Sequence, residues 1–122
     1  MDEIEPGVYA WIVASDLHYG DSMVATLFGL KSQDTQRGLP VARYLERIHI
    51  EDRAEVSRLI AKAVSDGQPF YAEYRVVGAK GLIRHVIDIG RCYYHSNGMP
   101  HLCSGIVYPV SQLNASAFVG TV

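Results

Sequence analysis

Asp88 is the residue whose surroundings in the sequence most suggest chemistry. The run from Leu82 to His95 alternates like a β-strand, and its period of two places Asp88 on one largely apolar face with Val86. If that face is buried, the carboxylate needs a partner. Arg84 shares the face and is the expected partner, which favours a structural salt bridge or a strand-end position. The alternatives are a contact with a bound ligand and, last, a catalytic role.

Two cysteines and a histidine form the second candidate group. Asn97-Gly98 is typical of a two-residue hairpin turn, and such a turn sets Cys92 opposite Cys103 and Tyr94 opposite His101. A four-residue loop would change this register. The group could be a thiol redox pair or a metal site, but three ligands without CxxC or HxxxH spacing give a weak metal signal. Core packing of the cysteines is the favoured interpretation.

The other histidines do not cluster in the sequence. His18 falls on a short early strand and is expected to be exposed, and His49 lies where a helix begins. The hairpin register places His95 on the face opposite His101. The sequence has no GxSxG, phosphate-loop or zinc-protease motif. We therefore predict no catalytic residues, no metal site and no enzymatic activity.

Aromatic residues could form the walls of a cavity. The candidates are Trp11, Tyr19, Tyr74 and Tyr94. Such residues pack equally well into a filled core, so the sequence leaves both possibilities open.

The elements that must position these residues follow from hydrophobic periodicity. Val56, Leu59, Ile60, Ala63 and Val64 form the apolar stripe of one long helix, which ends at Asp66-Gly67. Strands are predicted at 8–14, 17–19, 70–77, 82–95 and 100–108, and short helices are predicted after Asp21 and from Pro40. Residues 31–38 are polar and are predicted to be a loop. This order predicts an α+β fold: a five-stranded antiparallel sheet with short helices and one main helix on one face.

Several short motifs occur in an ordered series. They are Leu27-Phe28-Gly29-Leu30, Ile48-His49-Ile50-Glu51-Asp52-Arg53, Gly67-Gln68-Pro69-Phe70, Glu73-Tyr74-Arg75-Val76, the run from Lys80 to Val86, Gly98-Met99-Pro100 and Gly105-Ile106-Val107. In order and spacing they resemble the PAS domain family, in the branch with the signature hPeDr, EyR and dG..rW, over roughly residues 7 to 111. Ile50 stands where that branch usually has proline, and His85 where it usually has tryptophan.

The resemblance implies which sheet face meets the helices and a ligand. The expected inward residues, and candidate ligand contacts, are Tyr74, Val86, Asp88, Cys92, His101, Cys103 and Val107. The expected outer face is too apolar to remain wet. Only five residues precede Pro6, so we expect no N-terminal helix that could cover this face. We therefore predict a homodimer that forms through the sheet. The alternative is that the tail or a downstream segment covers the outer face. The candidate interface residues are Ile83, His85, Ile87, Ile89, Tyr93, Leu102, Ile106 and Tyr108.

Bulk properties narrow the function classes. The 122 residues correspond to one domain at 7–111, after a disordered lead-in at 1–6 and before a tail or linker at 112–122. A net charge of −2 without a basic block argues against nucleic acid, and no apolar run is long enough to span a membrane. Two cysteines and an acidic N-terminus suggest free thiols in the cytoplasm.

The family resemblance implies a sensory or protein-interaction module that regulates an output domain or partner in a bacterial-type signalling protein. Haem-binding relatives use a histidine on the main helix, and residues 51–68 contain none. Flavin-binding relatives carry an Asn-Cys-Arg stretch, and residues 43–48 contain no cysteine. No cofactor is therefore expected. The alternatives are a ligand-free dimerisation module and, less favoured, a small α+β enzyme resembling ketosteroid isomerases with Asp88 as the base.

Overall fold

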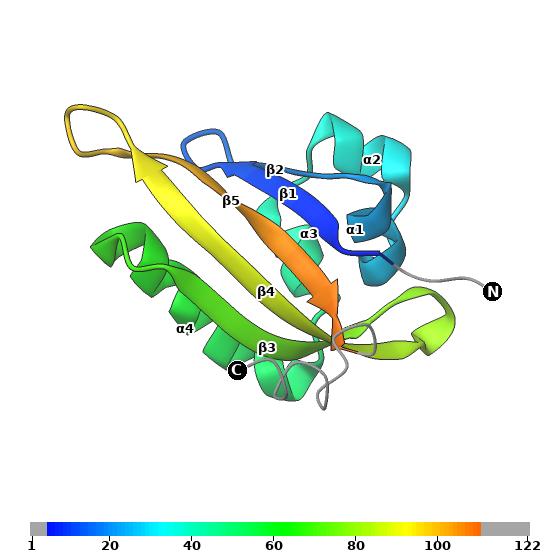
Figure 1. The fold of residues 1–122 in the computed structure, drawn as a ribbon. Coiled ribbons are helices and arrows are strands. Elements are labelled where there is room, and N and C mark those ends of the chain that lie inside the picture. Colours follow the sequence, from blue (N-terminus) through cyan, green and yellow to red (C-terminus); the bar gives the residue numbers. More distant parts are fainter. Residues whose placement is uncertain (1–4, 111–122) are drawn as a thin grey trace.

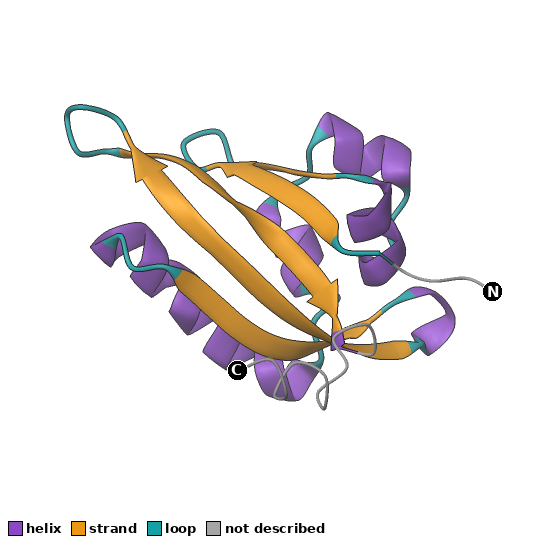
Figure 2. Ribbon diagram, in the orientation of Figure 1, coloured by secondary structure: helices purple, strands orange, loops and turns teal. Residues whose placement is uncertain are grey.

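One antiparallel sheet carries helices on a single face, as predicted. The computed structural model describes residues 5–110, and the sheet has the strand order β2-β1-β5-β4-β3 (Figure 1). The strands are β1 Gly7–Ile12, β2 Leu17–Gly20, β3 Phe70–Val77, β4 Ile83–Tyr94 and β5 Pro100–Pro109. The helices are α1 Ser22–Phe28, α2 Ser32–Arg37, α3 Val41–Leu45 and α4 Ile50–Asp66, with a 3-10 turn at Ala79–Gly81 (Figure 2).

Local signals fix both ends of α4. The His49 ring accepts a hydrogen bond from the Glu51 amide at the start of the helix, and Gly67 ends it with a φ of 70°. Arg75 of β3 binds Asp52 through two side-chain hydrogen bonds of 2.7 and 2.9 Å, which ties the first turn of α4 to the sheet. The Arg75 guanidinium lowers the pKa of Asp52 to about 2. Val56 and Ala63 pack into the core below.

The first third of the chain contains one helix more than predicted. The predicted helix after Asp21 is confirmed as α1, since the Asp21 carboxylate accepts a hydrogen bond from the Val24 amide at 2.9 Å. The predicted loop at 31–38 is wrong, because it contains α2. Of the α2 residues only Thr35 is buried, so the sequence carries no apolar period from which a helix could be read.

The β4–β5 hairpin has the predicted register at its centre but not at its tip. Cys92 lies opposite Cys103, as predicted, whereas Tyr94 lies opposite Pro100 and not His101. The turn is a three-residue loop in which the Gly98 amide donates to the His95 carbonyl, and Gly98 has a φ of 89°. An irregularity between Tyr93 and Tyr94 absorbs the extra residue.

The predicted domain boundaries fall mostly outside the described residues. The tail at 112–122 and residues 1–4 of the predicted lead-in lie there. Within residues 5–110, no helix is long and apolar enough to cross a membrane.

Candidate functional site

Two small adjoining cavities lie between the inner face of the sheet and the helices. Their volumes are about 60 Å³ and about 40 Å³. Both are lined by Tyr9, His18, Val41, Ile60 and Asp88. A cavity holds a water once it offers roughly 10–15 Å³, so the larger one has room for a few water-sized atoms.

Asp88 is the polar centre of both cavities. Its carboxylate is buried and accepts hydrogen bonds from the Tyr9 hydroxyl at 2.7 Å and from the Tyr74 hydroxyl at 2.9 Å. These side chains come from β1, β3 and β4, so the cluster joins strands from both halves of the sheet. Two short hydrogen bonds satisfy part of the acceptor capacity of the carboxylate and leave the rest open.

The protonation states in this cluster follow from burial. Loss of hydration raises the pKa of Asp88 to about 6, although the hydrogen bonds from Tyr9 and Tyr74 act in the opposite direction. Burial and the neighbouring carboxylate raise the pKa of both tyrosines well above the usual value. Both phenols therefore stay protonated at neutral pH and remain donors to Asp88.

The predicted salt bridge between Asp88 and Arg84 is wrong. The Arg84 guanidinium instead lies near the Thr26 carbonyl oxygen, at 3.5 Å. Residues four apart on a strand are separated by roughly 13 Å, at about 3.3 Å per residue, which is too far for a direct ion pair. Tyr74 and Tyr9 reach Asp88 because they lie on other strands.

His18 is buried, which corrects the predicted exposure. Its side chain is 8% exposed, and its ring lies between Tyr9 and Tyr44, with centroids 5.2 and 3.9 Å away. Burial lowers the pKa of His18 to about 4, so the imidazole is neutral at physiological pH. Its Nδ1 atom has no hydrogen-bond partner among the described residues. An unsatisfied buried nitrogen in a cavity wall is a place where a ligand or water could bind.

A pair of glycines makes room for Tyr9. Gly90 and Gly105 lie opposite each other on β4 and β5, and Tyr9 of β1 lies opposite Gly105. A Cβ atom on either glycine would lie within about 2.6 Å of the Tyr9 hydroxyl. The absence of these two side chains lets the phenol lie across both strands to reach Asp88.

The two cysteines form a disulfide, which corrects the expectation of free thiols. Cys92 and Cys103 join β4 to β5 and line the larger cavity. His101 does not share this site. It is exposed, and its ring lies 4.3 Å from that of His95, so the two histidines predicted on opposite faces are neighbours. The irregularity at the hairpin tip is the reason, since it ends the simple alternation before His101.

We expect the disulfide to contribute about 2–3 kcal/mol to the free energy of unfolding, because it closes a short loop in the unfolded chain. Replacing both cysteines by alanine should lower the thermal midpoint and abolish its response to a reductant. Ser104→Ala, next in the chain, is the matched control. An oxidised protein with the same midpoint before and after reduction would contradict the expectation.

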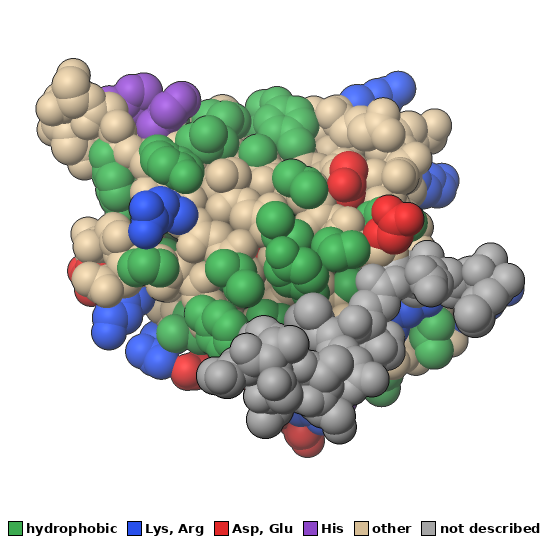
Figure 3. Space-filling view, in the orientation of Figure 1, with side chains coloured by type: hydrophobic (Ala, Val, Ile, Leu, Met, Phe, Trp, Pro, Cys, Tyr) green, Lys and Arg blue, Asp and Glu red, His purple; other side chains and the backbone are tan. Residues whose placement is uncertain are grey.

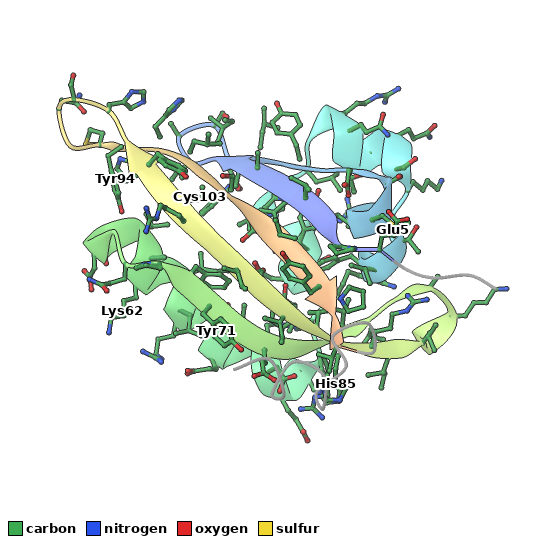
Figure 4. All side chains as sticks on the ribbon, viewed as in Figure 1. Glu5, Lys62, Tyr71, His85, Tyr94 and Cys103 are labelled. Carbon is green, nitrogen blue, oxygen red and sulfur yellow. A yellow bond between two sulfur atoms is a disulfide. The ribbon has the colours of Figure 1, made fainter. Side chains whose placement is uncertain are left out.

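The remaining inward predictions are confirmed in position. Tyr74, Val86, Asp88, Cys92, Cys103 and Val107 are all buried on the helix side. Of the predicted aromatic walls, Trp11 and Tyr74 each line one cavity. Tyr94 lies instead at the end of α4, where its hydroxyl donates to the Ala63 and Val64 carbonyls (Figure 4). Tyr19 packs near Gly38.

The outer face is apolar and uncovered among the described residues. None of its eight predicted residues is buried, and Ile83, Ile89 and Tyr93 are 50, 46 and 50% exposed. Hydrophobic side chains gather over the sheet on this face (Figure 3). An open groove of about 500 Å³ runs between Val8, Ile89, Tyr93 and Ile106. Within residues 5–110 no group of histidines, cysteines and acidic residues is suited to hold a metal ion.

Comparison with known proteins gives a consistent pattern. The family model described as PAS fold matches residues 18–107. A sensory box histidine kinase/response regulator from Burkholderia thailandensis superposes with a TM-score of 0.75 at 20% identity, covering 95% of this chain and 85% of that one. The N-terminal domain of a diguanylate cyclase with PAS/PAC sensor from Marinobacter aquaeolei gives 0.78 at 17% identity, covering 88% and 97%.

A PAS domain from Colwellia psychrerythraea has the same fold, with a TM-score of 0.67 at 16% identity and coverage of 88% and 87%. No curated protein sequence matches the chain. At these identities the solved structures show only that the chain shares their fold. The match to the family model is independent evidence, because it comes from the sequence itself.

Proposed function

Since the family model covers most of the chain, the protein belongs to the PAS fold family, and we propose that it is a sensory module that binds a small ligand between its helices and the inner face of its sheet. Binding, and not turnover, is the proposed activity. The output domain or partner protein that it would regulate is a further part of the proposal.

The observation that carries this proposal is the polar cluster in an otherwise apolar interior. Asp88 and His18 are both buried, both line the two cavities, and the His18 Nδ1 atom has no hydrogen-bond partner within residues 5–110. A core selected only for packing has no use for a desolvated carboxylate, because burial disfavours the charged form. Convergent polar groups in an apolar pocket are the usual mark of a ligand site.

The position of the cluster suggests how binding could be transmitted. Tyr9, Tyr74 and Asp88 hold β1, β3 and β4 together from the inside. A ligand that changes these hydrogen bonds would favour one arrangement of the strands over another, provided that it binds the two arrangements with different affinity. The outer face would carry that change to whatever packs on it.

We propose that the module works without haem or flavin. Cavities of about 60 and 40 Å³ would have to open widely for either group, since sites for drug-sized ligands usually span roughly 300–1,000 Å³. Small ligands of a few non-hydrogen atoms suit the volumes.

Native mass spectrometry of the purified protein, followed by the same measurement after denaturation, tests the ligand. We expect a mass excess under native conditions that disappears on denaturation. An absorption spectrum of the same sample would reveal a haem or flavin. A bare polypeptide, together with no shift of the thermal midpoint by any member of a library of small metabolites, would contradict ligand binding.

A ligand-free dimerisation module is the second candidate, and the small cavity volumes favour it. Both candidates use the outer face, and we propose that a second copy of the chain packs there. The exposed groove contains aliphatic and aromatic side chains and few charges, which is the composition of an interface core. An apolar sheet face of this kind is rarely left in contact with water.

Ile89→Arg should convert the dimer into a monomer, because it places a charge at the centre of the proposed interface. Ile50→Arg is the matched control, since Ile50 is 68% exposed at the start of α4, away from the outer face. Sedimentation velocity at about 10–100 μM distinguishes the two, with a weakening of at least about tenfold expected for Ile89→Arg alone. A wild-type monomer over that range would refute the dimer.

The cytoplasmic location suggested by the sequence stays a prediction. In cytoplasmic proteins disulfides are usually transient. If the protein is cytoplasmic, the Cys92–Cys103 disulfide of the structure should therefore be mainly reduced in the cell, and rapid alkylation of intact cells should find both residues mainly as thiols. A pair that is fully oxidised in the cell would favour another compartment.

A further inference from the structure

The buried carboxylate of Asp88 has no cationic partner among residues 5–110. It takes part in none of the salt bridges there, and both of its hydrogen bonds come from neutral phenols. An ionised carboxylate offers about four lone-pair positions, and two hydrogen bonds occupy half of them. The site thus has an unbalanced negative charge and unused acceptor capacity in one place.

The walls around this charge are aromatic. Tyr9, Trp11, His18 and Phe70 line the larger cavity together with Asp88. The faces of aromatic rings carry partial negative charge and attract cations within about 6 Å. His18 adds a neutral imidazole. Its Nδ1 atom has no partner in the part of the chain that the structure describes, and it can accept a hydrogen bond if the proton is on Nε2.

We propose that the ligand of the larger cavity is a small organic cation, a protonated alkylamine whose N–H groups bind Asp88 and His18 and whose carbon atoms pack on the aromatic walls. This inference rests on the proposed function, since it names the chemical class of ligand for the same cavity. A small anion is excluded by repulsion from Asp88. An apolar molecule would leave the carboxylate and the imidazole nitrogen unsatisfied, which carries a penalty in a desolvated site.

The volume of the cavity and the charge at its rim further limit which ligands could bind. A volume of about 60 Å³ is several times the roughly 10–15 Å³ that a single water requires, and it suits a ligand of only a few non-hydrogen atoms. Arg91 also borders the cavity, but it is an exposed residue. Solvent screens an exposed guanidinium more than it screens the buried carboxylate, so the net preference of the interior is for a cation.

Three compounds with the same number of non-hydrogen atoms test the inference: isopropylammonium, 2-propanol and acetate. Trp11 is the single tryptophan of the chain and lines the cavity, so its indole N–H signal in a ¹H–¹⁵N NMR spectrum reports binding. We expect isopropylammonium to bind with a Kd at least about tenfold lower than that of 2-propanol, and acetate to produce no saturable shift.

Two substitutions that each remove one carboxylate distinguish the local effect of Asp88 on binding from the effect of the protein's net charge. Asp88→Asn should raise the Kd for isopropylammonium at least about tenfold, while Glu73→Gln, on the exposed side of β3, should change it less than about twofold. If Asp88→Asn does not fold, the pH dependence of the wild type serves instead.

Wild-type affinity for isopropylammonium should rise between about pH 5 and pH 7, since Asp88 must ionise to bind a cation whereas an alkylamine remains protonated throughout. His18 stays neutral over this window. The other titratable groups near Asp88 are Tyr9 of β1, Tyr74 of β3, Tyr44 of α3 and the rim residue Arg91 of β4. Helix α4 contributes only the apolar residues Val56, Ile60 and Ala63 to the two cavities.

Two outcomes would overturn the inference. If 2-propanol binds as tightly as isopropylammonium, the cavity accepts neutral ligands and the cation preference is wrong, while the proposed ligand-binding function stands. If none of the three compounds shifts the Trp11 signal, the cation inference fails. The native mass measurement then decides separately whether a ligand of another class occupies the protein.

Discussion

Gly105→Ala is expected to destabilise the protein by about 3 kcal/mol and to disrupt the site. The added Cβ atom would overlap the Ile89 carbonyl oxygen, lie 2.6 Å from the Tyr9 hydroxyl and lie 2.7 Å from the Gly90 Cα atom. Two of these neighbours are backbone atoms of the adjacent strand, which cannot rotate away. Chemical denaturation of both proteins measures the difference in the free energy of unfolding.

Gly98→Ala is the matched control for this substitution. Gly98 lies at the hairpin tip, where an added Cβ atom would have no neighbour within 4 Å among the described residues other than those adjacent in the chain, although its φ of 89° is unfavourable for alanine. We expect it to lose about 1–2 kcal/mol from backbone strain alone. Adding Tyr9→Phe to Gly105→Ala should recover only part of the loss, because the backbone contacts remain. A Gly105→Ala protein as stable as Gly98→Ala would contradict the close packing at this point.

The fold was predictable from the sequence because its signals are local. The alternation in β3 and β4, the cap at Asp21 and the stop at Gly67 each act over a few residues, and the structure keeps all of them. Hydrophobic periods of 3.6 and 2 residues are sufficient to predict the long helix and the strands of the sheet. Helix α2 has no apolar stripe, and the side chain of its first flanking residue, Lys31, makes no capping hydrogen bond, so its helical state depends on its packing against α1 and β2.

The site was only half predictable, because its other half comes from distant strands. Asp88 is identified from the pattern of its own strand, but Arg84, the partner proposed for it, does not reach it, and His101 does not share its face as predicted. Arg84 is too far along the strand, and His101 lies beyond an irregularity that the Asn97-Gly98 signal does not reveal. Tyr9 and His18 lie on β1 and β2, which are too short to show a clear burial pattern.

One signal in the sequence could have pointed to Tyr9. Gly90 and Gly105 have the same predicted register as Cys92 and Cys103, and two glycines opposite each other inside a sheet leave space for a large neighbour. The pairing of β1 with β5, which identifies that neighbour, is a long-range feature that one sequence does not contain.

Asp88 should make the protein less stable as the pH rises from about 4 to 7. Its pKa is about 6 in the folded state and near 3.8 when exposed, so the folded protein binds more protons than the unfolded chain in this range, and stability falls with pH. The stabilisation from Asp88 is complete at pH values below its pKa in the unfolded chain, and it is lost as the pH rises through its pKa in the folded protein. The expected loss between about pH 4 and pH 7 is roughly 2–3 kcal/mol.

Asp88→Asn isolates this effect from all other titrations. The amide cannot ionise but has nearly the same shape as the carboxyl group. We compare the free energies of unfolding of the wild type and the variant. Their difference, wild type minus variant, should fall by roughly 2–3 kcal/mol between about pH 4 and pH 7. Glu73→Gln, which removes an exposed carboxylate, should follow the wild-type curve closely. Urea denaturation at several pH values provides the measurement. A difference that stays constant with pH would show that Asp88 ionises normally in the folded protein.

Tyr74→Phe then tests whether the hydrogen bond from a phenol lowers the pKa of Asp88. The hydrogen bond from Tyr74 lowers the pKa of Asp88 against the larger effect of burial, so its removal should move the midpoint of the pH dependence upward. Tyr71→Phe on the exposed side of β3 should leave the midpoint unchanged. A midpoint that moves downward would mean that water reaches the carboxylate once the hydroxyl is gone. The cavity would then be hydrated in the free protein, and a ligand would have to displace that water to bind.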